Sequence, residues 1–283
     1  MIAKQTSRLT ALLSLRVTPL TPFSVIWNNK HLLRRLVSQE VQSRYRGSLL
    51  GVVWSVLVPL SQLLVFTFIF TSVIPSRWGS NSGNVGEFSL NLFVGLIVYG
   101  LFSEALGRAP MLLLENPSYL KKVVFPVELL GVSALILALV NALISLVILL
   151  VFQFASTGAI SVTVIALPLV IIPFVLLLCG LIWFLCATGV YVRDLRYAIG
   201  PILSLFMFLS PVFYPASSLP SEFAWIFALN PLVPAIEQVR AIVLYGQWPT
   251  MRSILEMWTI GLISIWLGYL WFSGTRRGFA DVV

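Results

Sequence analysis

Long stretches without a charged side chain dominate this sequence and predict helices that cross a membrane. No Asp, Glu, Lys or Arg occurs from residue 47 to 76, and none occurs from 129 to 192. A helix needs about 20 apolar residues to cross the hydrocarbon core of a bilayer. The first stretch therefore predicts one span near residues 50–74. The second is long enough for two spans with a turn at 153–161.

Three more apolar segments, at 89–109, 197–214 and 254–273, bring the predicted number of spans to six. The segment between the last two is also apolar, but prolines divide it into pieces that are too short to cross a bilayer. Irregular backbone survives at membrane depth only where protein surrounds it or where it lines a cavity. We therefore expect two short re-entrant or interfacial helices at about 217–245, which form either a structural cap or an exit gate.

Composition agrees with an all-α integral membrane fold. Hydrophobic residues make up 59% of the chain and charged residues only 10%, and the mean hydropathy is +0.98. We expect one transmembrane domain over residues 1–283, made of an N-terminal region at 1–47, six helices at 48–274 and a tail at 275–283. Cys179 and Cys186 lie two helical turns apart in one apolar run, too far for a disulfide, and are expected to be apolar filler.

The distribution of positive charge predicts the orientation. If both termini lie in the cytoplasm, all of the 18 Lys and Arg residues except Arg77, Arg240 and Arg252 fall on the cytoplasmic side. Short loops rich in Lys and Arg stay in the cytoplasm, so this asymmetry predicts cytoplasmic termini. The net charge of +8 is then a topology signal, and a nucleic-acid partner is not needed to explain it.

Residues 31–46 predict an amphipathic helix before the first span. One side of the helical wheel is apolar and the other carries arginine and glutamine, which is typical of a helix that lies in the membrane interface with its apolar face down. Arg44 falls nearer the apolar side and must reach a partner or the headgroups. The helix is either a plain positive anchor, or Arg44, Tyr45 and Arg46 meet an anionic lipid headgroup before it enters the membrane.

The short loop after the second span predicts a small cytoplasmic helix. Pro117 suits the first turn of a helix, and Asn116 is a plausible N-cap. Lys121 and Lys122 complement the helix dipole at the other end, and Pro126 separates this helix from the third span. A rigid helix across a loop offers a docking site for a cytoplasmic partner; the alternative is a plain connector.

Several kinds of chemistry are absent from the sequence. The only histidine is His31 and the only aspartates are Asp194 and Asp281, so neither a histidine metal cluster nor a DxD site can form. No phosphate-binding loop is complete, because Leu101 stands where that motif requires lysine. If this protein moves a solute uphill, the energy must therefore come from another chain.

Two charges lie inside the predicted second span, Glu104 and Arg108. They are four residues apart on a helix, the spacing at which opposite charges pair. We expect them to neutralise each other.

Four motifs resemble the permease subunit of type-2 ABC exporters of polysaccharides, most closely its O-antigen and teichoic-acid branch. They are RYRGSLLGVVWSVLVPL (44–60), ENPSYLKKVVFPVELL (115–130), VYVRDLRYAIGPILSLFMFLSPVFYP (190–215) and LNPLVPAIEQVRAIVLYG (229–246). The similarity extends from about residue 25 to the C-terminus. The segment YRGSLLGVVW matches that branch well, and the chain is less like the capsule-type permeases.

The resemblance implies a homodimer in the bacterial inner membrane with two copies of a separate ATPase below it. ATP and Mg would be bound by that ATPase, and this chain would bind no cofactor. The cargo would be undecaprenyl-pyrophosphate-linked polysaccharide, with O-antigen of lipopolysaccharide as the first expectation. Residues 31–46 would form a gate helix and 217–245 periplasmic gate helices. The coupling helix that enters the ATPase would comprise Asn116, Pro117, Ser118, Tyr119, Leu120 and Lys121.

Aromatic rings on the first, second and fifth spans are candidate channel walls, because a ring face can slide along sugars without fixed hydrogen-bond partners. The candidates are Trp54, Phe66, Phe70, Tyr99, Phe102, Phe206, Phe213 and Tyr214. A type-2 ABC permease that exports drugs or small lipids is the alternative function. A membrane glycosyltransferase is disfavoured because the DxD motif is absent.

Overall fold

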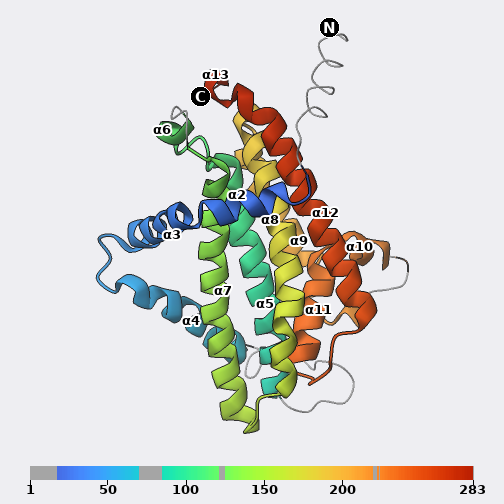
Figure 1. Cartoon of the computed structure of the whole chain (residues 1–283). Helices are drawn as coiled ribbons and strands as arrows, with labels where there is room; N and C mark the ends of the chain where they lie inside the picture. The colour runs from blue at the N-terminus through green and yellow to red at the C-terminus, as the bar shows by residue number, and fades with distance from the viewer. Residues whose placement is uncertain (1–17, 70–84, 121–124, 219–221, 223, 283) are drawn as a thin grey trace.

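The computed structural model describes residues 18–69, 85–120, 125–218, 222 and 224–282, and each regular element in these residues is helical (Figure 1). Short 3₁₀ turns connect several of the helices. The α-helices are α2 (Thr21–Asn28), α3 (Lys30–Tyr45), α4 (Trp54–Phe68), α5 (Val85–Gly107), α6 (Pro117–Leu120), α7 (Glu128–Thr157), α8 (Leu167–Tyr191), α9 (Leu195–Phe208), α10 (Ala224–Leu229), α11 (Leu232–Val243), α12 (Met251–Thr275) and α13 (Phe279–Val282).

Four helical segments of the described chain are long and apolar enough to cross a membrane: Phe88–Met111, Glu128–Thr157, Val162–Tyr191 and Met251–Gly278. They coincide with the predicted second, third, fourth and sixth spans. At the predicted first and fifth spans, α4 has 15 residues and α9 has 14, which is shorter than the length that a straight crossing needs. Residues 70–74 of the predicted first span lie outside the described residues. A total of six spans therefore stays a prediction.

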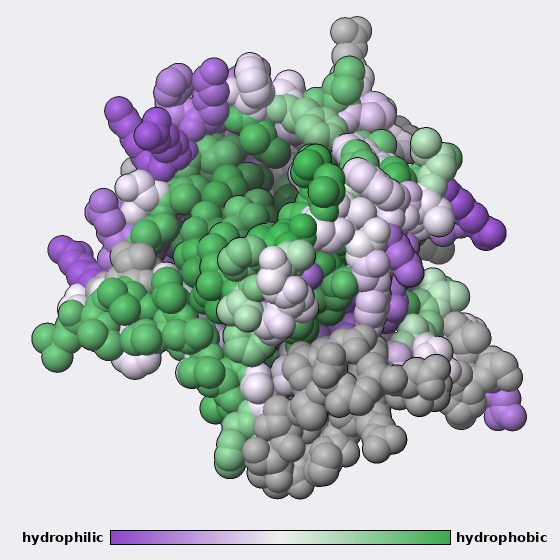
Figure 2. Space-filling view, turned by 90° about the horizontal axis from the view of Figure 1, so that it is seen from below, coloured by the Kyte–Doolittle hydropathy of each residue, from purple (hydrophilic) through white to green (hydrophobic). Residues whose placement is uncertain are grey.

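The long helices form an elongated bundle with distinct ends. Figure 1 shows α6 and α13 at one end and the turn between α7 and α8 at the other. In the view along the bundle from the α7–α8 end, hydrophobic side chains cover much of the face, and hydrophilic ones gather toward its edge (Figure 2).

The predicted turn between the third and fourth spans is confirmed. The helix α7 ends at Thr157, and Gly158 caps it with a φ of 73°, a left-handed conformation that glycine adopts without steric cost. Ser161 then begins the next segment, and its hydroxyl accepts a hydrogen bond from the amide of Thr163. In α8, Cys179 and Cys186 are buried and not bonded to each other, as expected.

The helices α8 and α12 touch backbone to backbone along a seam of small residues. A Cβ atom added at Gly180 would overlap the backbone of Ser264, and one added at Gly268 would overlap the backbone of Gly180. Close approach also lets the Ser264 hydroxyl donate to the carbonyl of Leu177, 3.0 Å away. Small residues are the usual means by which membrane helices pack, because hydrocarbon supplies no hydrophobic drive between them.

The predicted short helices after the fifth span are present as α10 and α11. A buried arginine holds α11 in place: Arg240 donates from Nε to the carbonyl of Asn91 at 3.0 Å and from Nη2 to the carbonyl of Val212 at 3.1 Å. Its Nη1 pairs with Glu237 at 3.0 Å. These bonds join α11 to α5 and to the segment after α9. Whether α10 and α11 re-enter the membrane stays a prediction.

The small-residue seam predicts the effect of adding one methyl group. Gly268→Ala should lower the free energy of unfolding by about 1–3 kcal/mol, the usual cost of overpacking, because α8 and α12 must move apart. The measurement is the temperature at which the detergent-solubilised protein loses its monodisperse elution. Gly200→Ala is the matched control, since its Cβ meets no atom within 4 Å. Equal midpoints for the two variants would contradict the seam.

Candidate functional site

The amphipathic helix predicted at 31–46 is confirmed as α3, but its apolar face meets protein. Leu33 and Leu36 are 7% exposed and belong to the main core of the molecule. Leu32 and Val37 pack against the same core from its edge. The neighbour is α7, so the expectation that this face lies down on the membrane is wrong at Leu33 and Leu36. Contact with a packed helix fixes α3 more firmly than contact with lipid would.

Two crossed ion pairs fasten α3 to the end of α5. Arg44 of α3 pairs with Glu104 of α5. One turn earlier on α3, Glu40 pairs with Arg108, at 3.3 Å between Oε1 and Nη1. On both segments the acidic residue precedes the basic one by four positions, and each acidic residue pairs with the basic residue of the other segment. Arg108 also pairs with Glu115 at 3.4 Å, immediately before the loop that carries α6.

The prediction that Glu104 and Arg108 neutralise each other is therefore wrong. Both residues have partners on other elements: Glu104 has Arg44 and the side-chain amide of Asn141 in α7, which donates at 2.8 Å. Spacing along one helix indicated a local pair, but the packing of α3 across α5 brought in competing charges. Arg44, expected to need a partner, has found one.

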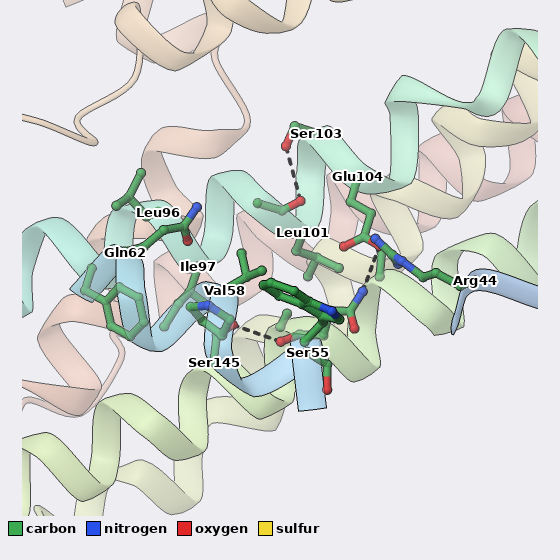
Figure 3. Close-up of a pocket in the computed structure, with 17 residues that line it drawn as sticks. Arg44, Ser55, Val58, Gln62, Leu96, Ile97, Leu101, Ser103, Glu104 and Ser145 are labelled. Atoms are coloured by element: carbon green, nitrogen blue, oxygen red, sulfur yellow. Dashed lines mark hydrogen bonds and ion pairs between the residues drawn. The ribbon is translucent and has the colours of Figure 1, made fainter. Parts of the chain in front are cut away.

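A cavity of about 470 Å³ lies between α4, α5 and α7 (Figure 3). Arg44 and Glu104 point toward each other at one end of it, and Gln62 lies at the other. No hydrogen bond is present between the Gln62 amide and another described residue. Polar groups on facing sides of membrane helices mark a wet or functional space. The polar lining comprises Arg44, Ser55, Gln62, Ser103, Glu104, Asn141 and Ser145.

Two more cavities continue from the first toward the α6 end. The second has a volume of about 490 Å³ and shares Arg44, Ser103 and Glu104 with the first. The third, about 140 Å³, shares Glu40 and Arg108 with the second and also reaches Asn116 and Tyr119 near α6. The Arg44–Glu104 pair thus lines both the first and the second cavity, and the Glu40–Arg108 pair lines both the second and the third. Together the three cavities run from the bundle interior to the α6 loop.

The small helix predicted after the second span is present as α6, a single turn at Pro117–Leu120, and its role in docking stays a prediction. Pro117 and Ser118 are exposed, and the ring of Tyr119 stacks on Phe125 with 4.4 Å between centroids. The Asn116 side chain donates to the carbonyl of Leu112 at 2.9 Å, so it secures the preceding turn. Lys121 lies outside the described residues.

The structure describes the surroundings of some of the predicted entrance residues but not of others. The guanidinium of Arg44 lines the first and second cavities. Arg46 is exposed just after α3 ends. Tyr45 is the last residue of α3, and its side chain lies outside what the structure describes. The role of these residues in binding an anion stays a prediction.

Two of the three candidate channel aromatics of the first span, Trp54 and Phe66, are described, and they have different surroundings. Trp54, at the start of α4, lines the 470 Å³ cavity. Phe66 is partly buried and packs against a small cluster of Phe88 and Leu92. Phe70 lies outside the described residues. Only Trp54 of these three is placed at the cavity.

The candidate aromatics on α5 and in the last turn of α9 hold these two helices together. The hydroxyl of Tyr99 donates to the carbonyl of Leu203 at 3.1 Å. Phe102 is 2% exposed, and its ring centroid lies 5.4 Å from that of Phe206. Within one chain these rings are packing contacts, and their role as channel walls stays a prediction.

The last two candidates follow α9. Phe213 stacks on Phe208 with 6.0 Å between centroids. Tyr214 donates to the carbonyl of Phe208 at 2.9 Å, and its ring stacks on that of Phe227 in α10. These contacts fix the route of the chain from α9 toward α10.

Asn141 is the site residue that sequence reasoning missed. It is an isolated amide within the long uncharged apolar stretch, and Ser145 follows it one turn later. A polar residue inside a spanning segment is a signal in itself, since hydrocarbon leaves it unsatisfied. Its partner, Glu104, was visible in the sequence but was assigned to the wrong neighbour.

A family model described as "ABC-2 type transporter" matches residues 31–244. This chain belongs to the ABC-2 type transporter family. This match and the relatives named below together confirm the resemblance to permeases of polysaccharide exporters. The match includes α3, the crossed ion pairs, the three cavities and α6, so the site lies inside the family's membrane domain.

Named relatives of this ABC-2 transporter chain are similar over most of their length. The "O-antigen export system permease protein RfbA" of Myxococcus xanthus is 29% identical over 260 residues, 91% of this chain and 97% of that protein. A protein of the same name from Klebsiella pneumoniae is 24% identical over 89% of this chain and 95% of its own length. The "Polysialic acid transport protein KpsM" of Escherichia coli is 23% identical over 82% and 89% respectively.

The environment of Glu40 predicts a pH dependence of stability. Burial is the largest influence and raises the pKa of its carboxyl above the ordinary value of 4.5, although Arg108 opposes the shift. The folded chain then holds this proton to a higher pH than the unfolded chain does. The corresponding stability is complete below pH 4.5 and is lost as the pH rises through the folded-state pKa.

Glu40→Gln removes the charge and keeps the shape. We therefore expect the melting midpoint of the variant minus that of the native protein to increase as the pH rises from about 4.5 to 7. Thermal unfolding in detergent at several pH values measures the difference. A variant that instead loses stability relative to the native chain over this range would show that the ion pair with Arg108 outweighs burial.

Proposed function

We propose that this chain is the permease subunit of an ABC exporter that moves undecaprenyl-pyrophosphate-linked polysaccharide, O-antigen of lipopolysaccharide in the first place, across the bacterial inner membrane. ATP hydrolysis in a separate subunit drives the transport. This chain contributes the membrane path and no catalytic residue. The observation that carries the proposal is its similarity, over nearly its whole length, to a permease named for O-antigen export.

The composition of the site supports a cargo that is anionic at one point and apolar at the next. Arg44 brings a positive charge to the junction of two cavities, and Arg46 is exposed two residues further along the chain. Guanidinium groups suit pyrophosphate because they donate two parallel hydrogen bonds. The start of α4 then offers exposed apolar side chains such as Trp54 and Val58, which also line the cavity. A lipid tail and its pyrophosphate fit these neighbouring surfaces.

The proposed assembly is a homodimer with two ATPase subunits. Both termini are cytoplasmic in this arrangement, α4 and α9 complete the set of six spans, and the aromatic candidates on α4, α5 and α9 line the path of the glycan. The exposed turn of α6 contacts the ATPase, while α10 and α11 lie on the outer side. Placement of α6 and α13 at the same end of the bundle supports this topology.

Docking through α6 predicts the effect of one surface substitution. Ser118 is exposed, so Ser118→Arg leaves the fold intact and places a long charged side chain in the contact with the ATPase. We expect most of the co-purifying ATPase to be lost, measured by affinity purification from membranes. Ser217→Arg, at an equally exposed site on the turn Ala216–Ser218, is the control and should retain the ATPase. Equal retention by both variants would contradict the docking role.

Depletion of this protein in its host tests the export function directly. The expected result is a rise of lipid-linked glycan on the cytoplasmic side, measured by mass spectrometry, together with loss of glycan from the cell surface. A pool that stays unchanged would favour the exporter of drugs or small lipids instead.

Complementation of the depleted strain tests the entrance. Arg44→Gln with Arg46→Gln should restore export only weakly, because both charges that face the pyrophosphate are gone. Arg34→Gln with Arg35→Gln, on the exposed polar face of α3, is the control with the same change of charge and should restore it. Equal restoration by the two double variants would contradict an anion-binding role for Arg44 and Arg46.

A further inference from the structure

The carboxylate of Glu104 is held by donors from two other helices. Arg44 of α3 donates through Nη1, and Asn141 of α7 donates through Nδ2 at 2.8 Å, both to the same oxygen. A guanidinium and an amide that converge on one oxygen anion form the donor set that proteins also use for phosphate. Glu104 thus occupies an anion site that α3 and α7 form together.

The position of this carboxylate is at a junction of two spaces. Arg44 and Glu104 line both the 470 Å³ and the 490 Å³ cavity, and Asn141 lines the first of them. In Figure 3 the Arg44 and Glu104 side chains meet at the end of the cavity remote from Gln62. The side chain of Arg44 is 42% exposed and that of Glu104 is 29% exposed. A ligand can therefore approach this pair from the cavity side.

We propose that Glu104 is an internal substitute anion, which the phosphate of an entering lipid headgroup displaces from Arg44 and Asn141. The inference rests on the proposed function, and it names the ligand class of that same site: a pyrophosphate or phosphate group attached to a lipid tail. In the empty protein Glu104 neutralises Arg44, so the charge beside the cavity costs little. On entry the phosphate takes the two donors, and the carboxylate turns away.

Displacement does not leave Glu104 without a favourable neighbour. Arg108 follows it by four residues, the spacing at which opposite charges on a helix surface pair. Arg108 is already shared between Glu40 and Glu115, so a third carboxylate competes for it. Occupancy of the anion site thereby weakens the contact between Arg108 and Glu115, the residue that precedes the α6 loop. The affinity for phosphate is set by this competition, and removal of the internal anion must increase it.

The test is a binding titration on the full-length protein in nanodiscs of phosphatidylcholine, which carry no net negative charge. The first probe is inorganic pyrophosphate, and isothermal titration calorimetry measures its binding. Glu104→Gln keeps the size of the side chain and removes its charge, so it should bind pyrophosphate at least about tenfold more tightly than the native protein. Arg44→Gln should bind it much more weakly than the native protein.

A matched control separates this effect from a general change of net charge. Glu256→Gln also removes a carboxylate that pairs with an arginine, here Arg252 at 2.8 Å on the exposed start of α12. It should leave the affinity unchanged. A Glu104→Gln protein that binds no more tightly than the native one, or a Glu256→Gln protein that gains as much, would overturn the proposal.

Two further arms identify the source of the phosphate. A polyprenyl pyrophosphate in the nanodisc should compete with the soluble probe, and more strongly in Glu104→Gln than in the native protein. Phosphatidylglycerol at the same mole fraction should compete less, since its single phosphodiester carries less charge. Stronger competition by phosphatidylglycerol would overturn the assignment to pyrophosphate. These binding results are independent of the depletion experiment, so unchanged glycan pools with tighter binding in Glu104→Gln would refute the export function and leave the anion site standing.

Discussion

Ionised side chains among membrane helices require partners, because hydrocarbon cannot solvate them. In this chain that requirement determines where α3 lies. At the end of α5, its Glu40 pairs with Arg108 and its Arg44 pairs with Glu104. A slip of α3 by one turn would therefore bring like charges together. The buried Leu33 and Leu36 supply attraction, while the charges supply the register. The cavities open where this arrangement leaves space.

The two halves of the bundle are built on different principles. On one side, α8 and α12 meet through Gly180, Ser264 and Gly268 with their backbones in contact, which leaves no room for adjustment. On the other side, ion pairs and a few apolar contacts hold α3, and α4 lies beside the 470 Å³ cavity. Ion pairs that are partly exposed contribute little to stability, so α3 is held less firmly than α8 and α12 hold each other. In the proposed function, the closely packed side would serve as the frame and the side with the cavities as the entrance for the glycan.

The α6 loop is held by an ion pair on each side. Before it, Glu115 pairs with Arg108, which also pairs with Glu40 of α3. After it, Glu128 at the start of α7 is 3% exposed and pairs with Arg276 at 2.6 Å, which ties the loop to the end of α12. The indole of Trp183 in α8 donates to the Glu128 carbonyl at 3.0 Å. The α6 loop is thus tied to the closely packed α8 and α12 through Glu128, and to α3 through Glu115 and Arg108.

Sequence pattern alone determined the class of the protein, the four long helices, the turn at Gly158, the amphipathic α3 and the short helices α10 and α11. These features depend on local composition and on prolines and glycines, whose effects are confined to their own segments. The tertiary structure decided the partners. Spacing along one helix paired Glu104 with Arg108, whereas the packing of α3 and α7 gave Glu104 to Arg44 and Asn141. Electrostatic pairing depends on distance in space, and a linear pattern holds that information only for residues within one or two turns.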